Sequence, residues 1–241
     1  MLSPPRSPVS VTHVTGIACG NGFLSRGIWQ GIAPDVNIVS LKILDRRGQG
    51  SSAHAIKGLR WIMDNATKYN IRVVNLSIGT NDRRAYPPLQ EAAEHLWQAG
   101  IVVVAAAGNP DQRNQYHPPP AVSSNVISVG AWEDRRYFQS PAFSLFTRAE
   151  EQQPDLWAPG EQIVSVLSPD YDFSLPGRSR DNIVGSHYIR MSGASMATPL
   201  ISGAAALLLR KYPHASPAEI RNRLLALSAG GCLRAETLLT L

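Results

Sequence analysis

The chain has 241 residues, of which 44% are hydrophobic and 17% are charged. This length and balance fit one large domain with a sizeable buried core and exclude a wholly disordered chain. The longest apolar stretch, 101–107, is far shorter than the roughly 20 residues that cross a bilayer, so we expect no membrane partner. The formal net charge of +5 comes from scattered single and paired residues, which favours solvated surface charge over a nucleic-acid-binding patch.

Short apolar runs alternate with amphipathic helical patterns along the chain. The spacing predicts strands at 37–44, 71–77, 101–107, 126–129 and 162–167. It predicts helices at 52–68, 88–98 and 195–211, and a last helix that starts at the capping-box pattern 216–219. Surface loops are expected at 118–120 and 168–181. Strands that alternate with helices indicate an α/β fold with a parallel sheet, in one domain.

The N-terminus and the cysteines give less information. The first ten residues, MLSPPRSPVS, lack the apolar centre of a signal peptide. Cys19 and Cys232 are too few for a disulfide framework and lie in no CxxC pair. We expect packed thiols, with a single bridge as the less favoured alternative, and these patterns predict neither a metal site nor a cofactor.

The most specific segment is 191–199 (MSGASMATP), a turn of small residues that leads into a helix. Ser195 falls in the first turn of that helix, where unpaired backbone N–H groups and the helix dipole stabilise an oxyanion. This position suits a nucleophilic serine. Because an ordinary N-terminal cap has the same local pattern, the other motifs in the chain have to decide between the two.

Four blocks in order resemble the subtilisin-like serine proteases, and the C-terminal half is similar to their AprX-like bacterial branch. The segment 193–199 (GASMATP) resembles the nucleophile motif G-T-S-M-A-x-P, with Ala194 in place of threonine. The run 102–109 (VVVAAAGN) resembles the strand that ends in the family's oxyanion-hole asparagine. The segment 73–79 (VVNLSIG) is similar to the substrate-pairing edge, and 154–160 (PDLWAPG) is similar to the D-x-x-A-P-G loop.

The resemblance implies a three-layer α/β fold with a mostly parallel sheet, and peptide-bond hydrolysis by acyl transfer. It implies that Ser195 is the nucleophile and that Asn109 donates to the oxyanion. The residues implied to hold the substrate form two edges, which are Ser77, Ile78 and Gly79 on one side and Ala106, Ala107 and Gly108 on the other. A polypeptide substrate is the expected partner of a monomeric chain. Many relatives bind calcium, for which the sequence assigns no ligands.

The rest of the family's catalytic set departs from the pattern. The histidine motif H-G-T-H-V-A-G corresponds to 10–16 (SVTHVTG), so Ser10 stands at the position of the general base and His13 matches the second, structural histidine. A catalytic His13 is the less favoured alternative, because it lies about one helical turn further on. The family's aspartate ends a strand upstream of the histidine, and none of residues 1–9 is acidic. We therefore expect a truncated peptidase domain over 10–241 that lacks the aspartate strand, preceded by a tail, 1–9, outside the family pattern.

These departures leave three functions open. The first is a serine endopeptidase that is nearly inactive as written, because a serine hydroxyl without a base is a poor nucleophile. The second is a pseudoprotease that binds extended peptides by β-augmentation. The third, a basic nucleic-acid binder, is disfavoured because no basic stripe or nucleic-acid motif is visible. The compartment, cytoplasmic or secreted, stays open.

Overall fold

The computed structural model describes residues 9–45, 49–80, 83–108, 118–134, 141–142, 154–175, 178–228 and 230–233. The helices are α1 (Val9–Cys19), α2 (Ser52–Tyr69), α3 (Tyr86–Gln98), α4 (Ala194–Lys211) and α5 (Pro217–Leu227). The strands are β1 (Val73–Leu76), β2 (Val102–Ala106), β3 (Ile127–Asp134), β4 (Pro141–Ala142), β5 (Leu156–Pro159), β6 (Ile163–Val166), β7 (Ile183–Val184) and β8 (Tyr188–Met191). Short 3-10 turns are η1 (Phe23–Ser25), η2 (Arg83–Ala85) and η3 (Arg180–Asn182).

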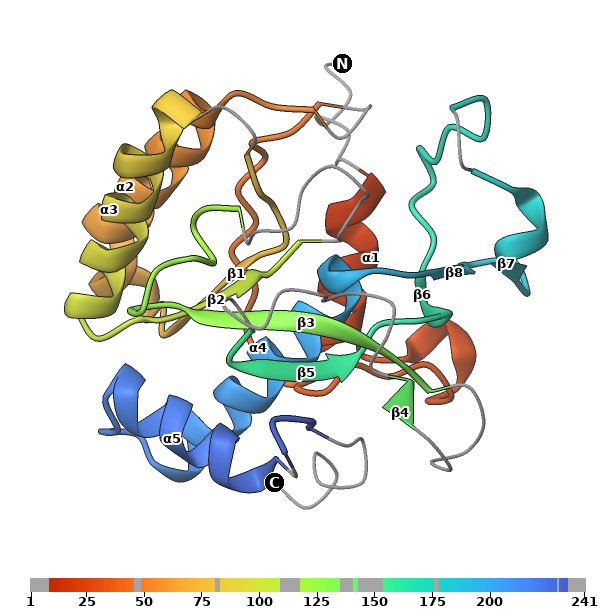
Figure 1. Ribbon diagram of the computed structural model, residues 1–241. Helices are drawn as coiled ribbons and strands as arrows, with labels where there is room; N and C mark the ends of the chain where they lie inside the picture. Colours follow the sequence, from red (N-terminus) through yellow and green to blue (C-terminus); the bar gives the residue numbers. More distant parts are fainter. Residues whose placement is uncertain are drawn as a thin grey trace.

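Four parallel strands form the central sheet in the order β1-β2-β3-β5 (Figure 1). The short strand β4 adds to β3 in the antiparallel direction, and β6, β8 and β7 form a separate antiparallel sheet. The predicted α/β fold with a parallel sheet is thus confirmed.

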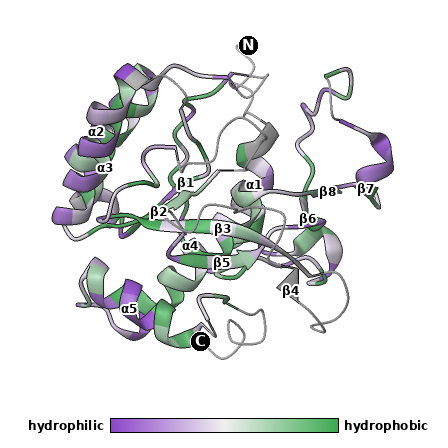
Figure 2. Cartoon of the chain, in the orientation of Figure 1, coloured by the Kyte–Doolittle hydropathy of each residue, from purple (hydrophilic) through white to green (hydrophobic). Residues whose placement is uncertain are grey.

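Helices cover both faces of the central sheet, so the molecule has three layers (Figure 1). Strand β2 is buried at every position, and its side chains alternate between two cores. Val102 and Val104 belong to the core formed with α4 and α5, whereas Val103 and Ala105 belong to the core formed with α2 and α3. In Figure 2 strands β3 and β5 are largely hydrophobic (green), whereas hydrophilic residues (purple) lie along α2 and α3. A strand that is apolar throughout fits this double coverage.

Most predicted elements are confirmed with small shifts at their ends. Helix α5 has the predicted capping box, in which the Ser216 hydroxyl accepts from the backbone N–H of Glu219. Helix α3 is followed by Gly100 at φ 86°, a left-handed conformation that glycine adopts without strain. Strand β3 runs further than predicted, to Asp134. Strand β5 is absent from the predicted elements, because four residues that end in a proline carry little strand signal.

The predicted strand at 37–44 is wrong, since no residue of this segment belongs to a strand. Leu41 and Ile43 pack against the core beneath α2 and α3, but Ile38 and Val39 are 53% and 42% exposed. A strand forms only where a neighbour can satisfy its backbone groups. Among the described strands β1 pairs with β2 alone, and none pairs with this segment. The segment has the residue types of a strand, but none of the described strands pairs with it.

The loop predictions are mixed. The predicted loop at 118–120 is present, but its expected position at the surface is wrong, because Pro119 and Pro120 are buried. The described part of 168–181 is largely exposed or half-buried and contains no strand, as expected. Neither Cys19 nor Cys232 forms a disulfide, in agreement with the favoured expectation.

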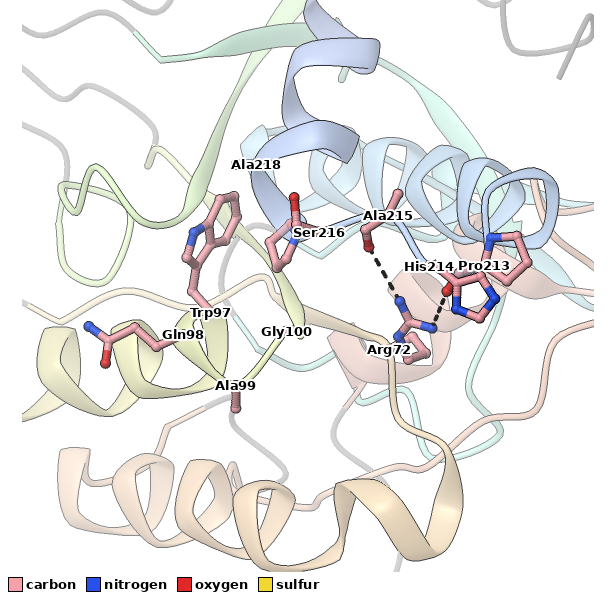
Figure 3. Close-up of a pocket in the computed structure, with 11 residues that line it drawn as sticks. Arg72, Trp97, Gln98, Ala99, Gly100, Pro213, His214, Ala215, Ser216 and Ala218 are labelled. Carbon is pink, nitrogen blue, oxygen red and sulfur yellow. Dashed lines mark hydrogen bonds between the residues drawn. The ribbon is translucent and has the colours of Figure 1, made fainter.

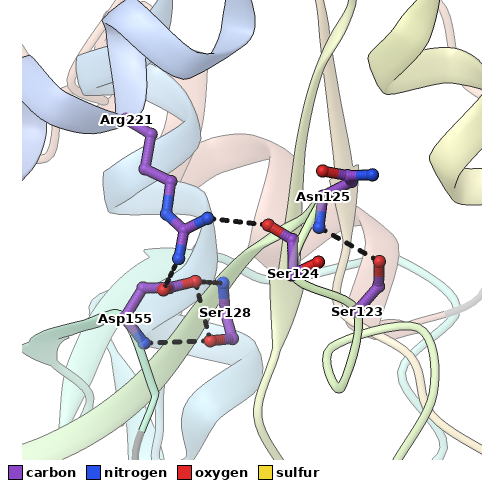
Figure 4. Close-up of polar contacts among 6 residues, drawn as sticks. All are labelled: Ser123, Ser124, Asn125, Ser128, Asp155 and Arg221. Atoms are coloured by element: carbon purple, nitrogen blue, oxygen red, sulfur yellow. Dashed lines mark hydrogen bonds and ion pairs between the residues drawn. The ribbon is translucent and has the colours of Figure 1, made fainter.

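Arg221 of α5 ties that helix to the edge of the sheet (Figure 4). Its guanidinium donates to one carboxylate oxygen of Asp155 and, at 2.7 Å, to the carbonyl oxygen of Ser124. The second carboxylate oxygen accepts from the backbone N–H of Ser128 at 2.8 Å and from its hydroxyl at 3.0 Å. The aspartate of the D-x-x-A-P-G motif therefore joins α5, β3 and the segment that leads into β5.

We expect Asp155→Asn to lower the free energy of unfolding by about 2 kcal/mol, because a neutral amide loses the charge-assisted bond to the guanidinium. Urea denaturation followed by circular dichroism measures this. Asp181→Asn is the matched control, because Asp181 is exposed and its carboxylate accepts from the hydroxyl of the neighbouring Ser179. Equal losses in the two variants would contradict the role given to Asp155.

Candidate active site

A hydrogen bond and close packing against the D-x-x-A-P-G segment hold the turn that carries Ser195 in place. Helix α4 begins at Ala194 with Gly193 as its N-cap, so Ser195 lies in the first turn. The backbone N–H of Gly193 donates to the carbonyl oxygen of Gly160 at 2.7 Å. A Cβ at Gly160 would come within 3.0 Å of the Gly193 carbonyl oxygen, so a glycine is needed where the two segments meet. The shape of this turn thus depends on contacts with a segment about 30 residues earlier in the chain.

Ser195 and Ser77 exchange two hydrogen bonds. The Ser77 hydroxyl donates to the Ser195 carbonyl oxygen at 3.0 Å, and the Ser195 hydroxyl donates to the Ser77 carbonyl oxygen at 3.4 Å. The side-chain amide of Asn75 donates to the Ser77 hydroxyl at 3.1 Å and accepts from the Ser202 hydroxyl at 2.8 Å. The end of β1 is therefore linked to the first and the third turn of α4.

The backbone of Ser195 offers a donor for negative charge. The N–H groups of Met196 and Ala197 donate to the carbonyl oxygen of Gly193. The N–H of Ser195 has no acceptor in the part of the chain that the structure describes. An N–H group that is free at a helix start can stabilise an oxyanion. Ala194 is 1% exposed and has no hydroxyl to add to this donor.

The two predicted substrate edges lie next to each other. Residues 77–79 follow β1, and residues 106–108 end and follow β2. The two strands are adjacent and parallel, so their carboxyl ends meet at one edge of the sheet. Asn109, the next residue, lies outside the described residues. The side chain of Ser10 does too, although its backbone belongs to α1.

His13 is 0% exposed and packs against the second sheet. Its Nε2 is 3.0 Å from the carbonyl oxygen of Ile189 in β8, and its own carbonyl oxygen accepts from the Ser165 hydroxyl of β6 at 2.8 Å. Its Nδ1 has no partner among the described residues. Burial lowers the pKa of His13, although the hydrogen bond to Ile189 opposes this effect. A neutral imidazole that joins α1 to the second sheet is a structural group.

The buried imidazole predicts a pH-dependent stability. The unfolded chain takes up a proton on this side chain near pH 6.5, whereas the folded chain does so only at lower pH, so stability falls as pH drops below about 6.5. The slope between the two pKa values approaches about 1.4 kcal/mol per pH unit. Urea unfolding between pH 5 and 8 should show a shallower slope for His13→Gln than for the parent chain. His95→Gln, at an exposed position, is the control, and an unchanged slope in His13→Gln would refute the assignment.

A hollow of about 560 Å³ lies at the opposite end of the sheet (Figure 3). Arg72 precedes β1 and Gly100 precedes β2, and the far wall is the connection from α4 to α5. Arg72 bridges the hollow by donating to the carbonyl oxygen of Pro213 at 2.8 Å. Because Ser195 lies at the carboxyl ends of the strands, this hollow is separate from the candidate site.

The described residues contain neither a cluster of metal ligands nor a helix that could span a membrane. Within the described ranges, no three His, Cys, Asp or Glu side chains gather as metal ligands would, so calcium gains no candidate ligands there. None of the described helices has the length and apolar character of a membrane span.

Comparison with known proteins defines the class. The model of the subtilase family, Peptidase S8, matches residues 11–234, and the chain belongs to this family of serine peptidases. It is 37% identical to serine protease AprX of Bacillus subtilis, over 88% of this chain and 51% of the relative. It is 34% identical to subtilisin DY of Bacillus licheniformis, over 88% of this chain and 68% of the relative. The solved structure of sphericase has the same fold, with a TM-score of 0.76 at 24% identity, over 92% of this chain and 70% of that chain. The chain spans about half the length of the first curated relatives that it matches.

Sequence reasoning missed two polar residues of the site, Asn75 and Ser202. Both act through hydrogen bonds that connect elements more than 100 positions apart, which no local pattern reveals. A weak signal exists in α4, where Ser195 and Ser202 are seven residues apart and so share one helix face.

Proposed function

We propose that this chain is the peptidase domain of a subtilisin-like serine endopeptidase, in which Ser195 attacks an extended polypeptide. The observation that carries the proposal is the pair of hydrogen bonds between Ser195 and Ser77. It places the hydroxyl beside the first residue of an edge with which a substrate backbone can pair. The N–H of Ser195, which has no acceptor among the described residues, supports the same assignment.

The chemistry is acyl transfer. The Ser195 Oγ adds to the scissile carbonyl carbon, its proton passes to a base and then to the leaving amine, and water hydrolyses the resulting ester. The charge that develops on the carbonyl oxygen meets the backbone N–H of Ser195 and, by the family resemblance, the side-chain amide of Asn109. Such preorganised donors supply a large part of the rate enhancement of an acyl transfer.

The alternative, a peptide-binding pseudoprotease, is favoured by one observation. The Ser195 hydroxyl donates to a backbone carbonyl oxygen and not to an imidazole, and a serine stands at position 10. A hydroxyl with no base to accept its proton reacts slowly at neutral pH. We therefore propose that the 241-residue chain binds peptides along the edges 77–79 and 106–108 and hydrolyses them at close to the background rate.

Three measurements on the purified chain test this proposal. We expect an extended fluorescent peptide to bind by fluorescence polarisation, casein hydrolysis to stay near background, and a fluorophosphonate to label the chain weakly. Ser195→Ala should remove the remaining labelling, and Ser186→Ala, an exposed serine, should not. Robust turnover that Ser195→Ala abolishes would show that a base is present, and His13→Ala would then be the next variant. Absence of peptide binding would refute the proposed peptide-binding site.

A further inference from the structure

One proline ring fills the gap between the two substrate edges. A Cβ built on Gly79 would lie 2.7 Å from Cγ of Pro118, and a Cβ built on Gly108 would lie 2.9 Å from Cδ of the same ring. Non-bonded carbons prefer separations of about 3.5 to 4.0 Å. The ring therefore occupies the space that a Cβ on either glycine would need, so it lies between the two edges at this point.

The ring is held firmly in this place. The backbone N–H of Ala121 donates to the Pro118 carbonyl oxygen at 3.1 Å, which closes a tight turn. The next three residues, Pro119, Pro120 and Ala121, are buried. A proline has no side-chain rotamers and a fixed φ, so the ring cannot swing aside as a leucine or methionine would.

The position of Ser195 relates this ring to the substrate. The Ser195 hydroxyl contacts the Ser77 carbonyl oxygen, and Gly79 lies two residues further along the same edge. Side chains of an extended chain alternate between its two faces, so a substrate paired with both edges would direct alternate side chains toward the gap in which Pro118 lies.

We propose that Pro118 restricts the cleavage site to small side chains, such as alanine, glycine or serine, on the residue that supplies the scissile carbonyl. This inference rests on the proposed function. A glycine on each edge lets the substrate backbone come close, but the ring leaves no depth for a leucine or phenylalanine side chain. The preference is set by shape, since Gly79, Gly108 and Pro118, the described residues that meet at the gap, carry no charge.

The direct test compares binding of fluorescein-labelled Ala-Ala-Pro-X peptides in which X is alanine, leucine or phenylalanine. We expect the parent chain to bind the alanine peptide at least about 10-fold more tightly than the phenylalanine peptide, a typical discrimination for an apolar pocket. Pro118→Gly should bring this ratio close to one, and Pro118→Ala should give an intermediate ratio. Pro169→Gly, which changes an exposed proline in the 168–175 loop, should leave the ratio unchanged.

The outcomes separate this inference from the proposed function. If the peptides bind but the ratio is the same in the parent and in a folded Pro118→Gly, the inference is wrong and the proposed peptide-binding site stands. If no peptide binds to any variant, both the proposed peptide-binding site and the inference are wrong.

A second test needs no peptide. Gly79 does not have a left-handed φ, so an alanine is excluded there by contact with Pro118 and not by backbone strain. Gly79→Ala should lower the melting temperature, and adding Pro118→Gly should restore at least half of the loss. Equal losses with and without Pro118→Gly would show that the ring does not close the gap.

Discussion

Peptide hydrolysis should become about 10⁶-fold faster than in the 241-residue chain when a base and an aspartate are supplied. This repaired chain carries Ser10→His and Val11→Gly and is extended at its N-terminus by the aspartate-bearing segment of Bacillus subtilis AprX. This magnitude is the one known for a subtilisin, in which removing the histidine costs about that factor in kcat. Glycine is needed at position 11 because the family motif leaves no room beside the base for a valine. Ser10→His and Val11→Gly without the extension should give about 10², because loss of the aspartate alone costs about 3 × 10⁴ in that enzyme.

Hydrolysis of a chromogenic peptide at pH 8 measures the gain. Within the repaired chain, Ser195→Ala should abolish the gain, and Asn109→Ala should remove about 10² to 10³ of it, since one oxyanion donor is lost. A repaired chain that melts cooperatively and still does not hydrolyse the peptide would refute the peptidase assignment. The peptide-binding function would then be the better description, and Ala194 would be the first residue to change.

The same extension should also stabilise the fold, by about 10 °C in melting temperature. Among the described strands β1 pairs with β2 alone and none pairs with 37–44, where the Ile38 side chain is 53% exposed. A strand seated on β1 buries several such side chains at about 1.5 kcal/mol or more each, and in a chain of this size each kcal/mol moves the melting temperature by about 2 to 4 °C. Without the strand, we expect the 241-residue chain to bind the dye ANS and to aggregate.

Differential scanning fluorimetry and ANS fluorescence measure both effects. An extension of equal length made of glycine and serine is the matched control, because it adds chain without a strand, and it should change neither value. A monomeric 241-residue chain with a sharp, reversible melt and no ANS binding would contradict this view of the sheet edge.

How much of the fold could be predicted depended on how local its signals are. Helix α5 was predictable because a capping box and a proline mark its start within four residues, and β2 because an unbroken apolar run is typical of a strand between two layers. The segment 37–44 has the pattern of a strand, but strand formation depends on a neighbour elsewhere in the sheet, and no pattern within the segment reports that neighbour.

The candidate site likewise has residues that local motifs predict and residues that they do not. The turn around Ser195 and the edge at Ser77 were predictable from motifs, and the structure brings these two residues into contact. The burial of His13 agrees with its match to the structural histidine. The place of Pro118 between Gly79 and Gly108 could not be predicted, because it depends on how a turn packs against the ends of two strands. Asn109 and the side chain of Ser10 stay predictions.

Helix α4 has a consequence for mutagenesis. Its first turn contains Ser195, and the helix also supplies the centre of one core, where Ile201, Ala204 and Ala205 are 0% exposed. A larger side chain at Ala204 or Ala205 would push the helix as a rigid rod, and because interiors are close-packed the displacement would reach its first turn. In a library of random variants of the repaired enzyme, peptide hydrolysis should therefore fail at these alanines while expression is still normal. In such a screen, loss of peptide hydrolysis would detect small shifts of α4 that a measurement of expression or folding would miss.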